Sequence, residues 1–236
     1  MRRRLGWGMA ICVSVMRPFA RVVTRQDWRG AENIPRSGGC VIATNHISEF
    51  DPVPVAHFVY DSGRMPRFLA KVEVFKLPVV GAILRNAGQI PVHRRSADAA
   101  KAYGAAVAAV ESGECVVVYV EGTITRDPGL WPMVGRTGAA RIALNTGCPV
   151  IPLAHWGAQD LLAPYARRPH LLPRKVVHVS VGPPVDLSDL TAAAPTPAQL
   201  REATSRIIAA ITAQLAVVRG ETPPAEPFDM RAGGAV

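Results

Sequence analysis

Short apolar runs alternate with helical patterns along most of this chain, and that alternation limits the folds open to it. Six runs rich in Val and Ile are typical of buried strands. They are Val41 to Thr44, Phe68 to Ala70, Gln89 to Val92, Val116 to Val120, Val150 to Ala154 and Val176 to Val181. Strands joined through helices run parallel to one another. The sequence therefore predicts an α/β fold with a largely parallel central sheet flanked by helices.

The helical segments have recognisable ends. Candidates lie at Pro52 to Tyr60, Ala97 to Glu111 and Gly138 to Asn145. Gly147 is placed to close the third of these. A last helix is expected after Thr196, with Pro197 at its first position, Gln199 completing a capping box, and an end near Gly220.

Composition indicates one folded domain with appendages and an anionic partner. The chain has 236 residues, of which 49% are hydrophobic and 19% charged. We predict a domain over residues 26–220 and a flexible tail over residues 221–236, where Pro, Gly and Ala are frequent. The net charge of +9 suits nucleic acid, an anionic membrane or a phosphorylated substrate. Nucleic acid is the weakest of these, because aromatic residues are only 6% and no basic helix carries interleaved stacking residues.

The N-terminus combines arginines with a short apolar run. Arg2, Arg3 and Arg4 precede the run from Leu5 to Met16, which is well short of the roughly 20 residues of a transmembrane helix. We predict that residues 1–25 form an interfacial, membrane-associated helix, with Trp7 and Phe19 on its apolar side. The alternative is a first helix packed on its own domain.

Cysteine and histidine spacing gives no sign of a metal site. The cysteines are far apart and lie in apolar runs, as buried free thiols of a reducing compartment do: Cys12, Cys40, Cys115 and Cys148. Four histidines are scattered and are expected in the core or on the surface: His93, His155, His170 and His178. The chain also lacks the glycine-rich phosphate loops of nucleotide sites, so we expect neither a metal nor a bound cofactor.

The segment Asn45-His46-Ile47-Ser48-Glu49-Phe50-Asp51-Pro52 follows the first predicted strand and contains a candidate base with a carboxylate. At ~100° per residue, five positions correspond to about 140° around a helix, so His46 and Asp51 would not meet on one. A turn must join them. Asp51 before Pro52 suits a helix start, from which the carboxylate could accept from a backbone N–H and from the His46 ring. That contact would fix the tautomer and leave the other ring nitrogen free as a general base.

Two further strand ends carry polar groups. One continues into His93-Arg94-Arg95, and the other into Glu121-Gly122-Thr123-Ile124-Thr125-Arg126. Ligands of open α/β sheets bind beyond the carboxyl ends of the strands. A base, cations and backbone donors would therefore converge there, as in a site that handles a phosphate.

The blocks NHISEFDP, GQIPVHR, VEGTIT and VIPLA, in this order, resemble those of the glycerolipid acyltransferases. This resemblance covers Asn45 to Ala154 and implies acyl transfer from an acyl-coenzyme A or acyl-carrier-protein thioester to a hydroxyl of a glycerol phosphate backbone. It implies that His46 deprotonates the hydroxyl and that Asp51 supports the imidazolium.

The same resemblance suggests residues that bind the acceptor and its phosphate: Arg94, Glu121, Gly122, Thr123, Lys71 and Arg136. Competing interpretations stay open for the cations. Arg94 could be a solvated strand end, Arg136 a surface charge, and Lys71 a partner of Glu73 or another acid.

The third block departs from the common family pattern. Tyr119 and Val120 stand where Phe and Pro are common, and Ile124 stands at the position of a common arginine. Arg126, two residues on, could supply that charge. These departures bear on the identity of the acceptor more than on the chemistry.

The resemblance implies synthesis of phosphatidic acid from 1-acylglycerol 3-phosphate at the cytoplasmic face of the cell membrane, by a peripheral or monotopic enzyme. The expected partners are the phospholipid surface, the acyl thioester donor and the lysophospholipid acceptor, without nucleic acid. One alternative is the same chemistry on glycerol 3-phosphate, another lysophospholipid or a glycolipid; another is a noncatalytic module that binds anionic lipid.

Overall fold

A seven-stranded sheet organises the chain in the computed structural model, which describes residues 6–92, 98–190 and 194–230. The strands are β1 (Thr24–Arg29), β2 (Cys40–Thr44), β3 (Pro66–Lys71), β4 (Ile90–Val92), β5 (Cys115–Tyr119), β6 (Val150–Trp156) and β7 (Lys175–Val181). Their order is β1-β7-β6-β2-β5-β3-β4. All neighbours are parallel except β6 and β7, so the predicted, largely parallel sheet is confirmed.

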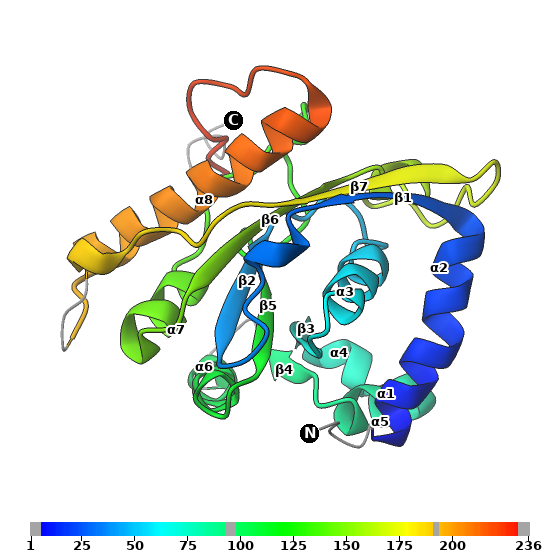
Figure 1. The fold of residues 1–236 in the computed structure, drawn as a ribbon, viewed down its shortest axis with the longest axis horizontal. Helices are drawn as coiled ribbons and strands as arrows, with labels where there is room; N and C mark the ends of the chain where they lie inside the picture. Colours follow the sequence, from blue (N-terminus) through cyan, green and yellow to red (C-terminus); the bar gives the residue numbers. More distant parts are fainter. Residues whose placement is uncertain (1–5, 93–97, 191–193, 231–236) are drawn as a thin grey trace.

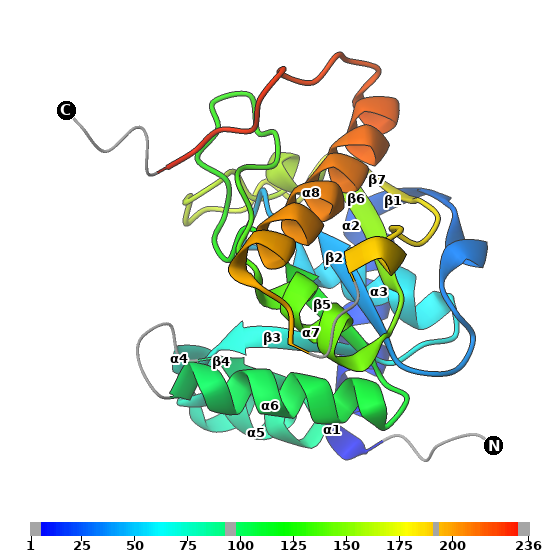
Figure 2. The same ribbon diagram turned by 90° about the vertical axis from the view of Figure 1, so that its left-hand side faces the viewer.

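Helices cover both faces of this sheet (Figures 1 and 2). They are α1 (Trp7–Ile11), α2 (Arg17–Val23), α3 (Pro52–Asp61), α4 (Val72–Phe75), α5 (Pro78–Asn86), α6 (Asp98–Glu111), α7 (Gly138–Thr146) and α8 (Pro197–Arg219). One core lies between the sheet and the helices α6, α7 and α8, and includes Ala106, Ile142 and Ile207. A second core lies under α3, where Val55 and Phe58 pack on strand residues. The central strands are consequently buried on both faces, which explains their continuous apolar sequences.

Most predicted elements are confirmed, including the capping box of α8, in which Thr196 and Gln199 bond reciprocally. Three of the labelled strands and α-helices were missed, namely β1 and the helices α4 and α5. Strand β1 has the polar sequence TRQDWR, which gives no apolar run, and it is recruited as an edge strand beside β7. Helix α5 was also not expected, although Pro78 occupies its first turn.

The N-terminal segment is helical and packs on the rest of the domain. A π-helical stretch, Cys12–Met16, joins α1 to α2. At the α1 to α5 contact, the amide of Gly8 donates to Asn86 Oδ1 at 2.7 Å. Phe19, which was expected on the apolar side of this segment, is half-buried and packs edge-on against Phe50 with ring centroids 6.3 Å apart. The predicted boundary after residue 25 falls inside β1.

The ends of the described chain add two facts. No helix within residues 6–92, 98–190 and 194–230 has both the length and the hydropathy to cross a bilayer. After α8, residues 221–230 form no helix or strand, and the amide of Val134 donates to the Phe228 carbonyl at 3.0 Å. The remainder of the predicted tail lies outside the described residues.

Candidate active site

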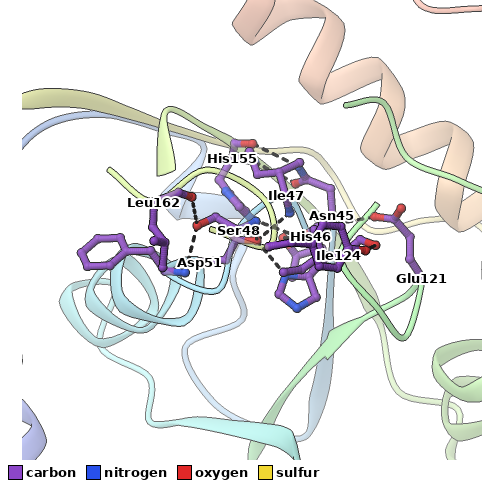
Figure 3. A network of polar contacts seen from close by, with 12 residues as sticks. Asn45, His46, Ile47, Ser48, Asp51, Glu121, Ile124, His155 and Leu162 are labelled. Carbon is purple, nitrogen blue, oxygen red and sulfur yellow. Dashed lines mark hydrogen bonds and ion pairs between the residues drawn. The ribbon is translucent and has the colours of Figure 1, made fainter. Parts of the chain in front are cut away.

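His46 and Asp51 meet where β2 ends, as the sequence predicted. His46 Nδ1 lies 2.7 Å from Asp51 Oδ2, and the imidazole keeps 17% of its side-chain surface exposed while Asp51 is fully buried. The carboxylate is an acceptor, so Nδ1 carries the proton of the neutral ring. The other ring nitrogen, Nε2, is therefore the basic one. Figure 3 shows this pair and the network around it.

Asp51 immediately precedes α3, but its carboxylate makes no capping bond to that helix. The carboxylate instead turns back toward the preceding loop. Its Oδ2 accepts the amides of Ile47 at 2.7 Å and Ser48 at 2.9 Å in addition to the ring of His46. The expectation of a helix start with a returning loop is confirmed, with loop amides as the backbone donors. These donors stabilise a buried negative charge beside the imidazole.

Asn45 and His155 hold the same loop from behind. Both are buried, and they exchange two bonds of 3.0 Å between the Asn45 side-chain amide and the His155 backbone. The His155 ring lies with Nε2 3.1 Å from the Asn45 carbonyl, so this nitrogen is protonated and donates. Burial lowers the pKa of His155. The ring stays neutral, although Nε2 is only 3.7 Å from Asp51 Oδ2.

Glu121 lies beneath the backbone of His46. It is 1% exposed, and its two carboxylate oxygens accept the amides of His46 and Met133, each at 3.0 Å. Burial raises the pKa of Glu121 to about 8, against the opposing effect of these donors. The amide of Thr125 donates to the His46 carbonyl at 2.8 Å. Glu121 thus positions the base in this structure, whereas the resemblance suggested contact with the acceptor.

The turn after Glu121 brings two predicted residues together. Gly122 has φ of +71°, and a Cβ there would lie 2.7 Å from Arg136 Cδ. The positive φ therefore favours glycine here, and the Arg136 side chain packs on the space that a Cβ would occupy. Thr123, the third predicted residue of this block, is half-buried in the same turn.

Arg126 is exposed at this edge of the sheet. Its guanidinium carbon lies 5.7 Å from the ring centroid of Tyr165, whose hydroxyl donates to the Ile124 carbonyl at 2.9 Å. The Ile124 side chain is buried. Position 124 therefore contributes an apolar side chain to the interior, and Arg126 is the cation of this loop.

Lys71 makes no bond to this network among the described residues. Lys71 is exposed at the end of β3, and no ion pair to Glu73 or another acid is formed within the described part of the chain. Arg94 lies outside the described residues. Residues 6–92, 98–190 and 194–230 contain no cluster of three His, Cys, Asp or Glu side chains arranged for a metal ion.

Several site residues were missed by the sequence interpretation. The sequence predicts His155 to lie in the core or on the surface and indicates no role for it. It indicates no partner for Asn45. Tyr119 stacks on His46, with ring centroids 4.2 Å apart and planes inclined by 23°. In the sequence, Asn45 and Tyr119 are noticeable only as polar residues at the end of an apolar run, and that position does not specify a distant partner.

Comparison with known proteins places this geometry in context. Over 132 residues, 56% of this chain and 51% of the relative, the chain is 34% identical to a 1-acyl-sn-glycerol-3-phosphate acyltransferase of Borreliella burgdorferi. Over 143 residues, 58% of this chain and 39% of the relative, it is 30% identical to a chloroplastic enzyme of the same name from Brassica napus. The chain thus matches about half or less of the length of these relatives.

A solved structure shares the fold. The 1-acyl-sn-glycerophosphate acyltransferase PlsC of Thermotoga maritima aligns with a TM-score of 0.68 at 21% identity, covering 95% of this chain and 86% of that one. The family model described as Acyltransferase matches residues 25–156, more than half of the sequence and all of β1 to β6 except Thr24. The resemblance identified from the sequence is confirmed, and the chain belongs to the Acyltransferase family.

Proposed function

We propose that this protein transfers a fatty acyl chain from an acyl thioester to the free hydroxyl of 1-acylglycerol 3-phosphate, giving phosphatidic acid. The observation that carries the proposal is the His46 Nδ1 to Asp51 Oδ2 contact of 2.7 Å, at a strand end that leaves the imidazole partly exposed. The names of the two relatives point to the same substrate class.

The chemistry requires little beyond this pair. His46 Nε2 takes the proton of the acceptor hydroxyl as the oxygen attacks the thioester carbonyl. The new C–O bond forms, the C–S bond breaks, and the thiolate leaves and takes up the proton from the imidazolium. Asp51 stabilises the imidazolium while it exists. A positioned base of this kind contributes about 10²- to 10⁴-fold.

Cations around the site supply the proposed binding of the acceptor phosphate. Arg126 and Lys71 are exposed at the carboxyl edge of the sheet, and Arg136 packs on the turn after Glu121. Arg94 is assigned the same role from the sequence alone. Each would contribute through a charge-assisted hydrogen bond.

The helices α1 and α2 are the proposed membrane contact. Outward apolar residues recur at helical spacing along α1, the π-helical stretch and α2: Trp7, Ile11, Val15 and Val22 are 53%, 41%, 58% and 65% exposed. Arg17 and Arg21 lie beside this stripe and pair with Asp61 at 2.9 and 3.6 Å. An apolar stripe flanked by cations suits the interface of an anionic leaflet, at the cytoplasmic face. Trp7→Glu should reduce flotation with anionic vesicles, whereas Val217→Glu, at an equally exposed apolar position on α8, should not.

A different acceptor is the second candidate, because position 124 places a buried isoleucine where the family commonly has an arginine. Purified protein given one labelled acyl thioester and a panel of acceptors distinguishes the two. Labelled phosphatidic acid formed from 1-acylglycerol 3-phosphate at the highest kcat/KM supports the main proposal. A higher value with glycerol 3-phosphate, another lysophospholipid or a glycolipid supports the second, and absence of thiol release with every acceptor contradicts both.

A further inference from the structure

The imidazole of His46 has an aromatic neighbour that the proposed mechanism does not use. Tyr119 is the last residue of β5, and its ring stacks on His46 at 4.2 Å between centroids. Phe68 stacks behind it, with its centroid 6.1 Å from that of Tyr119 and the same 23° inclination. The Tyr119 ring thus contacts both the His46 imidazole and the Phe68 ring.

Strand register explains the stack. Tyr119 pairs with Thr44 in the parallel ladder of β2 and β5, and the amide of Val120 still donates to the Thr44 carbonyl at 3.2 Å. His46 follows Thr44 by two residues, so the chain leaving β2 carries the imidazole over the ring that ends β5. The stack is thus built by two adjacent central strands.

An aromatic face beside an imidazole acts on one of its charge states. The face of the ring carries the negative part of its quadrupole and attracts a cation within about 6 Å of its centroid. A neutral imidazole gains little from this attraction, whereas the imidazolium formed during proton transfer gains it fully. An interaction that grows with the developing charge lowers the barrier.

Three other titratable side chains lie close to the His46 segment, and each has a defined contact. Asp51 lies at Nδ1 from the start of α3, His155 approaches the same carboxylate from β6, and Glu121 holds the His46 amide from the loop after β5. Burial raises the pKa of Tyr119 well above its usual range, so the phenol stays neutral. Its hydroxyl is buried and has no hydrogen-bond partner within the described chain. The ring, and not the hydroxyl, contacts the base.

We propose that Tyr119 is a positioning residue of this acyltransferase, whose aromatic face orients the His46 imidazole and stabilises the imidazolium that forms when His46 accepts the proton of the acceptor hydroxyl. The catalytic part of this proposal rests on the proposed role of His46. The stabilisation of the imidazolium does not, because it can be measured without turnover.

NMR titration of His46 in the full chain tests the proposal, with the resonance assigned by its loss in His46→Gln. Tyr119→Leu should lower the pKa of His46 by about 0.4 to 1.5 units, because the aromatic face is removed. Tyr119→Phe retains the face and should leave that pKa unchanged. Phe68→Leu, the same kind of change one ring further away, is the matched control and should also leave it nearly unchanged.

Kinetics provide the second measurement. Tyr119→Leu should lower kcat by about 2- to 30-fold and shift the acid limb of the pH–rate profile to lower pH, the same direction as the change in the His46 pKa. Tyr119→Phe should leave both kcat and the pH–rate profile unchanged. A pKa of His46 that does not change in Tyr119→Leu overturns the proposal, as does an equal shift in Tyr119→Phe. If Tyr119→Leu does not fold, the wild-type spectrum decides: stacking shifts the His46 ring protons upfield, and their absence from that region overturns the proposal.

Discussion

Among the His–Asp contacts of the described residues, two have nearly the same geometry and very different surroundings. His46 Nδ1 lies 2.7 Å from Asp51 Oδ2, and His178 Nδ1 lies 2.8 Å from Asp27 Oδ2. Asp51 is fully buried and receives two loop amides, whereas Asp27 is 40% exposed and is shared with Arg29 at 3.4 Å. Distance alone therefore does not distinguish the proposed catalytic pair from a surface pair.

The difference lies in position and support. The His46 pair stands at the carboxyl end of a central parallel strand, with Asn45, Glu121 and His155 fixing its backbone from below and behind. The His178 pair joins the edge strand β1 to β7. Preorganisation at a strand end is what makes a carboxylate and an imidazole useful for proton transfer.

The largest expected contrast comes from neutralising each carboxylate. Asp51→Asn should lower kcat by about 10²- to 10⁴-fold, because the imidazolium loses its counter-ion and the amide can impose the wrong tautomer. Asp27→Asn should leave kcat within twofold or so of wild type, because its pair joins the edge strand β1 to β7 and makes no bond to the His46 loop. Steady-state thiol release measures both, and similar losses in the two variants would contradict the comparison.

The next effect concerns Glu121, a support that only the first pair has. Glu121→Gln should lower kcat by about 10- to 100-fold, because an amide nitrogen must then face one of two backbone donors. For comparison, His46→Ala removes the base itself and leaves the Glu121 side chain and both of its backbone donors in place.

The same substitution changes the pH dependence of stability. The folded protein holds the Glu121 proton up to about pH 8, whereas the side chain of the unfolded chain releases it near pH 4.5. The folded state therefore binds more protons across this interval, and stability falls as pH rises through it. Urea unfolding at several pH values should show a shallower fall for Glu121→Gln than for wild type; identical slopes would show that Glu121 is ionised throughout.

A smaller effect is expected behind the site. His155→Leu should cost about 1 to 3 kcal/mol of unfolding free energy, because the buried Asn45 carbonyl loses its ring donor. His155→Gln, which carries a donor at a similar reach, should recover much of that loss. Chemical denaturation measures both variants, and equal stability of the two would show that the ring packs without a useful hydrogen bond.

The smallest effect belongs to the exposed cations near the first pair. Arg126→Ala should raise KM for the acceptor about two- to fivefold without changing kcat, and the effect should shrink with added salt. Arg36→Ala is the control, because Arg36 is exposed before β2, at the opposite end of that strand. An effect on kcat at Arg126 would place it in the chemistry instead of in acceptor binding.

Local patterns accounted for the central strands and for the His46 to Asp51 contact. The strands are apolar throughout, and the Asp51-Pro52 step encodes a helix start within one short segment. Strand β1 was missed because its polar sequence becomes a strand only through pairing with β7, which lies far along the chain. Tertiary pairing overrides local preference at such edges.

The supporting residues could not be predicted for the same reason. Asn45 and His155 are 110 residues apart and meet because β2 pairs with β6. Tyr119 reaches His46 because β2 also pairs with β5. The order of strands in a sheet cannot be derived from local sequence patterns. His46 could therefore be predicted as the candidate base, whereas the residues that hold it could not.

The central claim is that His46 is the base of this acyltransferase, and turnover of His46→Ala tests it most directly. The variant is first compared with wild type by circular dichroism and thermal unfolding, and thiol release from acyl-coenzyme A is then followed with 1-acylglycerol 3-phosphate as acceptor. We predict a folded protein whose turnover is reduced by about 10²-fold or more. A folded His46→Ala protein with turnover near that of wild type would contradict it.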